Sequence, residues 1–162
     1  MILTAIDILC VGKIKERFYE DAVKEYLKRL SRYAKVSVIE VKDEKTCEGN
    51  TEHEDKIILK REGERLLKYL DDDAYIISLC IEGKETSSPG LADIISAAEN
   101  QGKSHIQFVI GGSLGIDEEI KKKSSLRLSF SQMTFPHQLM RVILLEQVYR
   151  AYRIKNNEPY HK

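Results

Sequence analysis

The segment HIQFVIGGSLGIDEEIKKKSSLRLSFSQMTFPHQLMRVILLEQVYRAYRI, residues 105–154, determines most of what the sequence predicts about the fold. Two apolar runs, residues 106–110 and 126–130, each end in a loop; the first loop is rich in glycine and the second is polar. A helical pattern follows each loop, and the longest one covers residues 139–154. Ligands of α/β sheets bind beyond the carboxyl ends of the strands. We therefore expect the functional site in this half of the chain.

Upstream of this segment, apolar runs alternate with helical patterns. Such runs, nearly all apolar and separated by helices, are typical of a parallel sheet covered on both faces. We predict one α/β domain over residues 1–162, with a mostly parallel sheet and helices on both of its faces. The further strands are expected at residues 6–11, 36–41 and 75–81, and the further helices at 16–32, 57–70, 91–100 and 117–123, where Asp117 is placed to cap the last of them.

Composition excludes several classes of protein. With 162 residues and 42% hydrophobic content, the chain can bury a core and is not expected to be disordered. Its apolar runs are shorter than the roughly 18 residues of a membrane span, and the N-terminus lacks the basic lead-in of a signal peptide. Cys10, Cys47 and Cys80 are odd in number and lack CxxC spacing, so neither disulfides nor a zinc site is expected. We expect a cytoplasmic protein without a metal or a membrane partner.

Charge is distributed unevenly although the net charge is zero. Residues 120–162 contain nine basic and two acidic side chains, whereas residues 1–119 contain 17 basic and 24 acidic ones. This asymmetry indicates either an anionic partner at the C-terminal end, such as phosphate or nucleic acid, or a solvated basic face.

The glycine loop, residues 111–115 (GGSLG), is compatible with a cofactor site or with a structural turn. Gly111 and Gly112 directly after a strand permit a sharp turn and a close approach of a ligand to the backbone. The spacing G-G-x-x-G differs from the G-x-G-x-x-G of dinucleotide-binding folds, and no acidic residue ends the next strand to bind a ribose. The Gly-Lys-Ser/Thr of a phosphate-binding P-loop is absent as well. The motif alone leaves both interpretations open.

The second loop, residues 130–136 (FSQMTFP), is called the polar loop below. It carries no charge and mixes apolar side chains with Ser131, Gln132 and Thr134. Aromatic and thioether surface beside free peptide groups suits an adenine ring, which needs apolar faces and hydrogen bonds at its edge. An ordinary connection between a strand and a helix, with Met133 and Phe135 in the core, is the other interpretation.

The last helix has more apolar positions than one core-facing stripe requires, so it either forms a dimer interface or lies deep in the core. Arg150 and Arg153 are one helical turn apart and can meet one phosphate. The C-terminal Tyr160-His161 pair is suited to stack on a base or bond to it, although most tails of this kind are disordered. The apolar positions are Leu139, Val142, Ile143, Leu145, Val148, Tyr149 and Tyr152.

Together these segments resemble a known family. Residues 11–33 (VGKIKERFYEDAVKEYLKRLSRY), 108–115 (FVIGGSLG), 128–154 (LSFSQMTFPHQLMRVILLEQVYRAYRI) and 159–162 (PYHK) are similar to the ribosomal large-subunit pseudouridine N3-methyltransferases. These are small bacterial enzymes of the SPOUT, or trefoil-knotted, methyltransferase class. The resemblance covers essentially the whole chain.

The resemblance implies a C-terminal segment threaded through a loop as a trefoil knot, an exception to the rule that chains do not thread. It also implies a homodimer in which the partner's tail completes each active site. The implied substrate is a pseudouridine in a hairpin loop of 23S rRNA within the assembled ribosome. The implied cofactor is S-adenosyl-L-methionine, and the residues expected to bind it are Leu79, Gly111, Phe130, Ser131, Gln132, Met133, Thr134 and Phe135.

The chemistry of such a reaction points to further residues. Methyl transfer from a sulfonium is an in-line displacement governed by positioning. The N3 atom of pseudouridine is a poor nucleophile while protonated, so a base, or donors that stabilise charge on the flanking carbonyls, would lower the barrier. The candidate catalytic residues are His161 for proton removal or base positioning, Tyr160 for stacking or hydrogen bonding, and Arg150 for holding phosphate or the base carbonyls. His137 is expected to orient the polar loop.

Three other functions are kept open. A ribosome-binding protein that has lost the cofactor would not need the intact glycine and polar loops. A SPOUT methyltransferase acting on tRNA would differ in the RNA that takes up labelled methyl. A nicotinamide-dependent enzyme would need the ribose-binding acid that is missing after the glycine loop.

Overall fold

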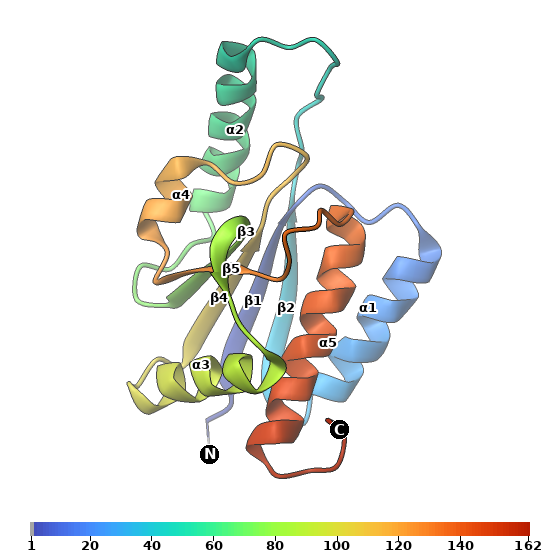
Figure 1. Cartoon of the computed structure of the whole chain (residues 1–162), viewed down its shortest axis with the longest axis vertical. Coiled ribbons are helices and arrows are strands. Elements are labelled where there is room, and N and C mark those ends of the chain that lie inside the picture. The colour runs from blue at the N-terminus through green and yellow to red at the C-terminus, as the bar shows by residue number, and fades with distance from the viewer. Residues whose placement is uncertain (1) are drawn as a thin grey trace.

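A sheet of five parallel strands forms the centre of the molecule, in the order β2-β1-β4-β3-β5 (Figure 1). The computed structural model describes residues 2–162, so that Met1 of the predicted domain lies outside it. The strands are β1 (Thr4–Val11), β2 (Ala34–Val41), β3 (Tyr75–Glu85), β4 (His105–Ile110) and β5 (Leu126–Ser129). The helices are α1 (Arg17–Leu30), α2 (Glu52–Leu67), α3 (Ser88–Asn100), α4 (Glu118–Lys123) and α5 (His137–Lys155).

Both faces of the sheet are buried, because successive side chains of a strand point to opposite faces. In β1, Ile6 and Ile8 pack into the core beneath α1, α3 and α5. Leu9 and Val11 of the same strand belong to the second core, which α2 and α4 cover. The prediction of a parallel α/β sheet with helices on both faces is therefore confirmed.

Two helix starts were predicted from capping residues, with different outcomes. Ser87 caps α3 as expected: its side chain accepts a hydrogen bond from the backbone of Gly90, and Pro89 occupies the first turn. Asp117 precedes α4, but its side chain makes no capping hydrogen bond. It lies instead against Gly63 of α2, where an added Cβ would be 2.9 Å from the Asp117 carboxylate. Asp117 is thus the N-cap residue of α4, as predicted, but its carboxylate packs against α2 and makes no capping hydrogen bond to α4.

Strand β3 runs to Glu85, beyond the end predicted at residue 81. Its pairing with β5 shifts register, so that Leu128 is opposite both Leu79 and Lys84. The backbones approach closely at this bulge, since a Cβ on Gly83 would be 2.8 Å from the backbone of Leu128. The charged residues after position 81 obscured this extension, because their backbone stays paired with β5 while their side chains face solvent.

The strand order brings the important loops together. Leu79 is paired with Ile110 of β4 on one side and with Leu128 of β5 on the other. The glycine loop follows Ile110 directly, and the polar loop begins two residues after Leu128. The end of β3 and these two loops therefore share one edge of the sheet.

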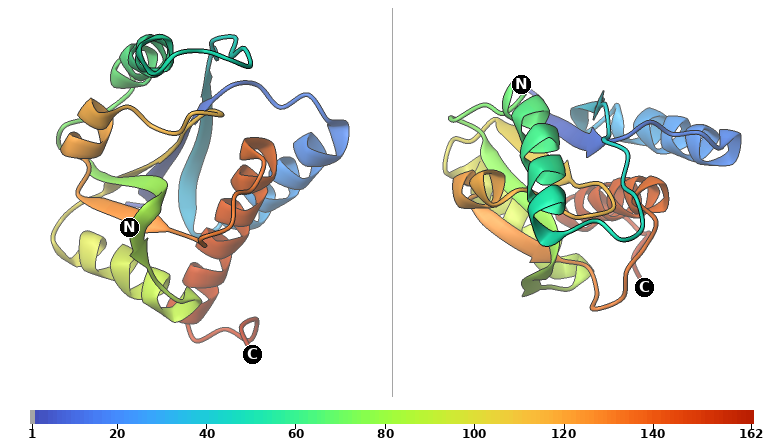
Figure 2. Two further views of the ribbon diagram at one scale, coloured as in Figure 1. Left: turned by 45° about the horizontal axis from the view of Figure 1, so that its top comes forward. Right: turned by 90° about the horizontal axis from the view of Figure 1, so that it is seen from above.

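Helix α5 packs against α1 and α3, and one buried side chain fixes its start to the sheet. Arg141 is fully buried and donates hydrogen bonds to the Glu40 carboxylate (2.6 Å) and to the carbonyl oxygen of Gly12 (2.6 Å). The polar loop enters one end of α5, and the C-terminal tail folds back at the other end (Figure 2). The threading implied by the family resemblance stays a prediction.

Candidate active site at the carboxyl ends of the central strands

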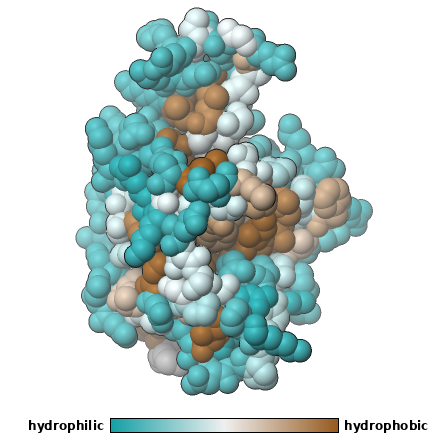
Figure 3. All heavy atoms as spheres, viewed as in Figure 1, coloured by the Kyte–Doolittle hydropathy of each residue, from teal (hydrophilic) through white to brown (hydrophobic). Residues whose placement is uncertain are grey.

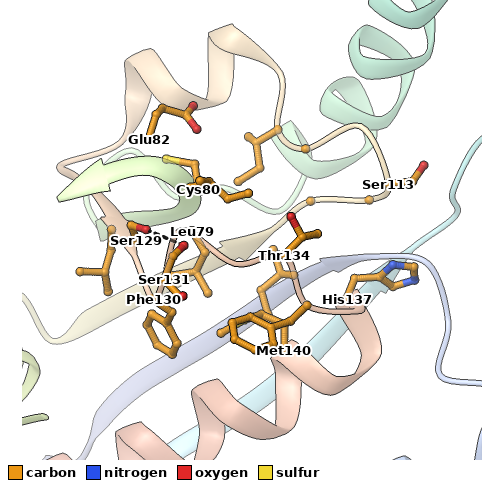
Figure 4. A pocket seen from close by; sticks show the side chains of 18 of the residues that line it. Leu79, Cys80, Glu82, Ser113, Ser129, Phe130, Ser131, Thr134, His137 and Met140 are labelled. Carbon is orange, nitrogen blue, oxygen red and sulfur yellow. Dashed lines mark hydrogen bonds between the residues drawn. The ribbon is translucent and has the colours of Figure 1, made fainter. Parts of the chain in front are cut away.

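A cavity of about 760 Å³ opens where β3, β4 and β5 end (Figure 4). Its walls are the end of β3, the glycine loop, the polar loop and the first turn of α5. Small-molecule sites typically have volumes of about 300–1,000 Å³. The cavity thus has the size and position expected of a cofactor site in an α/β sheet.

The glycine loop closes tightly on itself. The backbone N–H of Gly115 donates to the carbonyl oxygen of Gly112 over 3.1 Å, and Gly115 has a φ of +91°. A Cβ on Gly111 would lie only 2.2 Å from the carbonyl oxygen of Gly115. Glycine is therefore required at Gly111 by the turn itself, and this turn forms one wall of the cavity.

The polar loop is shaped by its own short side chains. Ser129 donates to the carbonyl oxygen of Ser131 (3.1 Å), and the Ser131 hydroxyl accepts from the backbone N–H of Met133 (3.0 Å). Hydrogen bonds between serine side chains and nearby backbone hold such turns in non-helical conformations. The chain consequently reverses over the cavity before α5 begins.

The cavity has an apolar and a charged part. In Figure 4, Leu79, Phe130 and Met140 lie on the α5 side of the cavity, whereas Cys80 and Glu82 lie on the opposite side, toward α4. Glu82 forms an ion pair of 2.5 Å with Lys121, which also lines the cavity. A ligand with an apolar ring and a zwitterionic end is complementary to such walls.

Most of the residues expected to bind the cofactor line this cavity: Leu79, Gly111, Phe130, Ser131, Met133, Thr134 and Phe135. Gln132 is the exception, because its side chain is exposed and donates to Glu85 (3.0 Å) on the extended end of β3. The alternative interpretation of the polar loop placed Met133 in the core. The structure contradicts this placement, since Met133 is 72% exposed at the cavity mouth.

Several lining residues were not singled out from the sequence, and they include Cys80, Glu82, Lys121 and Met140. Cys80 and Glu82 lie one and three residues after Leu79, so the end of the third strand was the available signal. Burial, followed by the nearby Glu82 charge, raises the pKa of the Cys80 thiol. Cys80 is therefore protonated at neutral pH and is not a nucleophile there.

His137 lines the cavity at the start of α5. Burial and the positive charge of Arg141 lower the pKa of its imidazole. The ring is consequently neutral at neutral pH, with one nitrogen able to donate and the other able to accept a hydrogen bond. This state is compatible with the expected role in orienting the polar loop.

The three candidate catalytic residues lie together around Glu146; the group is called the tail cluster below. Arg150 donates to the Glu146 carboxylate (2.6 Å), and the Tyr160 hydroxyl donates to the same carboxylate (3.1 Å). The Arg150 guanidinium lies 4.6 Å from the centre of the Tyr160 ring and donates to Nδ1 of His161 (3.3 Å). The tail is thus ordered against α5.

The tail cluster and the cavity are separate within one chain. Arg150 lies 13 residues after His137, which at 1.5 Å per residue is about 20 Å along α5. Neither Arg150 nor Tyr160 nor His161 lines the cavity. Arg150 pairs with Glu146 and Arg153 with Glu158, and the binding of one phosphate by both arginines stays a prediction.

Two negative findings concern the described residues 2–162. None of their helices has the length and hydropathy of a membrane crossing. The same residues contain no cluster of His, Cys, Asp and Glu side chains suited to hold a metal ion.

Comparison with known proteins assigns the class. The family described as "Predicted SPOUT methyltransferase" matches residues 4–161, and the chain belongs to this family. Its fold is shared, at 12% identity and a TM-score of 0.56, by a probable methylase family protein from Haemophilus influenzae, over 100% of this chain and 72% of that one.

Within the family, the chain is similar to proteins named ribosomal RNA large subunit methyltransferase H. The protein of this name from Bifidobacterium animalis subsp. lactis is 57% identical over 157 residues, which is 97% of this chain and 99% of that protein. The one from Bifidobacterium adolescentis is 54% identical over the same shares. The resemblance expected from the sequence motifs is therefore confirmed.

Proposed function

We propose that the protein transfers a methyl group from S-adenosyl-L-methionine to N3 of a pseudouridine in a hairpin loop of 23S rRNA in the assembled ribosome. The observation that carries this proposal is the cavity, which is built from the segments expected to bind the cofactor. The similarity to ribosomal RNA large subunit methyltransferases supports the choice of RNA. The basic C-terminal segment is compatible with an anionic substrate, and the cytoplasm is the proposed location.

The residues present fit the proposed cofactor. S-adenosyl-L-methionine supplies an activated methyl group on a sulfonium. Leu79 and Phe130 provide apolar surface for its adenine, and the backbone at Gly111 can approach closely because no Cβ intervenes. Glu82 and Lys121 offer opposite charges to its amino and carboxylate groups.

The tail cluster provides the groups that the acceptor base requires. Arg150 keeps its positive charge at any working pH and can hold a phosphate or neutralise charge developing on the base carbonyls. His161 can accept the N3 proton, and Tyr160 can stack on the base or bond to it. Glu146 orients two of these groups through the hydrogen bonds described above. These roles belong to the proposal.

A homodimer reconciles the separate positions of the cavity and the tail cluster. Apolar surface gathers over α5 (Figure 3), where Leu139, Val142 and Ile143 stay partly exposed. Burying this face against a second copy would remove apolar surface from water. It would also allow the tail of one protomer to reach the cavity of its partner, which the tail of the same chain does not line.

The test supplies labelled S-adenosyl-L-methionine with free 23S rRNA, with tRNA, or with ribosomes from a strain that lacks this gene. We expect label in the ribosomes alone, at N3 of one pseudouridine. Label in tRNA would replace the proposed substrate. Binding of the cofactor without transfer to any RNA would refute the methylation reaction and leave the cofactor site in place.

A further inference from the structure

Glu62 of α2 is a buried carboxyl group outside the proposed chemistry. Its residue is 4% exposed, although glutamate is rarely buried unless paired. Its Oε2 accepts one hydrogen bond, from the backbone N–H of Glu44 (3.0 Å). Its Oε1 has no hydrogen-bond partner among residues 2–162. Leaving a buried polar atom unpaired is costly, so the position asks for an explanation.

The side chain of Glu62 lies directly behind the glycine loop. A Cβ on Gly112 would be 3.3 Å from Oε1 of Glu62, 3.4 Å from its Oε2 and 3.1 Å from Val11. Gly112 faces the cavity with its other side, since it is one of the lining residues. The Glu62 carboxyl group and Val11 thus form the support on which this turn rests.

The charges around Glu62 do not favour a carboxylate. Asp43 and Glu44 from the loop after β2 bring two further acids, and both raise the pKa of Glu62. Burial is the largest cause of the rise. The hydrogen bond from the backbone N–H of Glu44 and, more weakly, the charge of Arg65 on α2 oppose it only in part. Arg65 and, at longer range, Arg61 pair with Glu44 instead. If the carboxyl group of Glu62 is protonated, no negative charge is buried at a position that no cation contacts.

We propose that Glu62 is a positioning residue for the glycine loop: its buried carboxyl group supports Gly112 from behind and thereby sets the affinity of the cavity for the methyl donor. This rests on the proposed function, in which the cavity binds S-adenosyl-L-methionine. Deprotonation places a charge against the turn, which has to loosen to let water reach it. Donor binding, which needs the turn closed, then weakens.

The first test uses the full-length protein without any ligand. Hydrogen exchange of the amides of residues 111–115, expressed as protection factors, reports on the turn itself. In the wild type, we expect protection to fall as the pH rises above the ordinary carboxyl range. Glu62→Gln keeps the shape and the neutrality, so its protection should not change with pH. Glu62→Ala should lose protection at every pH.

The second test measures the affinity for S-adenosyl-L-methionine by calorimetry between pH 5 and 9. If closure of the turn raises the pKa of Glu62 by about one pH unit, the affinity of the wild type for the donor falls about tenfold as the pH rises through this titration. The affinity of Glu62→Gln should stay constant over the same range. Glu64→Gln, the same change at an exposed position of α2, should behave like the wild type. Asp43→Asn should move the wild-type step to lower pH.

The outcomes separate this proposal from the proposed function. Absence of donor binding in the wild type refutes the donor site, whereas the exchange experiment still decides the role of Glu62. Parallel pH profiles of the wild type and Glu62→Gln overturn the proposal. So does a Glu62→Gln variant as impaired as Glu62→Ala, because an amide cannot replace an ionised carboxylate. If Glu62→Ala does not fold, the comparison of the wild type with Glu62→Gln and Asp43→Asn remains decisive.

Discussion

Replacing Arg141 by methionine tests how α5 is fixed to the sheet. The guanidinium of Arg141 is fully buried and joins the start of α5 to the Glu40 carboxylate and to the carbonyl oxygens of Val11 and Gly12. Methionine fills much of the same space but offers no donor. The change therefore removes the donor from two carbonyl groups and from the Glu40 carboxylate, which keeps the hydrogen bond from the backbone N–H of Ile14 (2.9 Å).

The size of the stability loss depends on how far each remaining group can bond to water after the substitution. Removing one partner of a buried ion pair costs about 3–5 kcal/mol. We take the lower end, about 3 kcal/mol, because the side chain of Glu40 is 34% exposed and regains water. The Nε of Arg141 already lacks a partner among the described residues, which also limits the loss. For a chain of 162 residues, such a loss lowers the melting temperature by about 6–12 °C.

Urea unfolding followed by circular dichroism measures this loss, with two comparison variants. Arg141→Lys keeps the charge without the planar fork of donors, so it should lie between methionine and the wild type. Arg61→Met removes a solvent-exposed arginine, whose pairing with Glu44 spans 3.9 Å, and should cost less than about 1 kcal/mol. An Arg141→Met protein within about 1 kcal/mol of the wild type would refute the role assigned to this side chain.

Three further predictions concern the site, the dimer and pH. Gly111→Ala should lower the rate of methylation by about 100-fold, because the new Cβ meets the Gly115 carbonyl oxygen at 2.2 Å and displaces the turn by about 1 Å. An unchanged rate would show that the turn is not part of the site. Mixing inactive Gly111→Ala and His161→Ala proteins should restore about a quarter of wild-type methylation through heterodimers with one intact site, and no recovery would contradict a shared site. His105→Asn should destabilise the fold most below pH 6.5, the ordinary pKa of the imidazole. Burial lowers the pKa of His105, but hydrogen bonds to Asp7 (2.6 Å) and to a second aspartate outweigh burial and raise it, so the protonated ring stabilises the fold. That contribution disappears as the pH rises through the raised pKa, and urea unfolding between pH 5 and 8 in which the two proteins differ equally at every pH would refute it.

The local pattern of the sequence was sufficient to predict the strands and helices, whereas the resemblance to the methyltransferase family named most of the residues that line the cavity. Apolar runs such as residues 106–110 are strands because each side chain finds a buried face, and their glycine and polar ends mark where the chain turns. Because ligands of parallel sheets bind beyond the carboxyl ends of the strands, the pattern located the functional site in residues 105–154; the resemblance then placed Gly111 and Phe130 in one site. Gln132 shows the limit, because its contact with Glu85 depends on an extension of β3 that hydrophobic periodicity does not reveal.

The sequence by itself determined which segments form strands and helices and which chemical groups follow each strand. Only the tertiary structure decided that Leu79 lies between Ile110 and Leu128, that Arg141 and Glu62 are buried, and that the tail cluster is remote from the cavity. Periodicity records how one segment divides its side chains between core and solvent. The cost of burying a charge, and the distance between two groups on different segments, depend on which other segments pack there. Those contacts join residues far apart in the chain, and no local pattern encodes them.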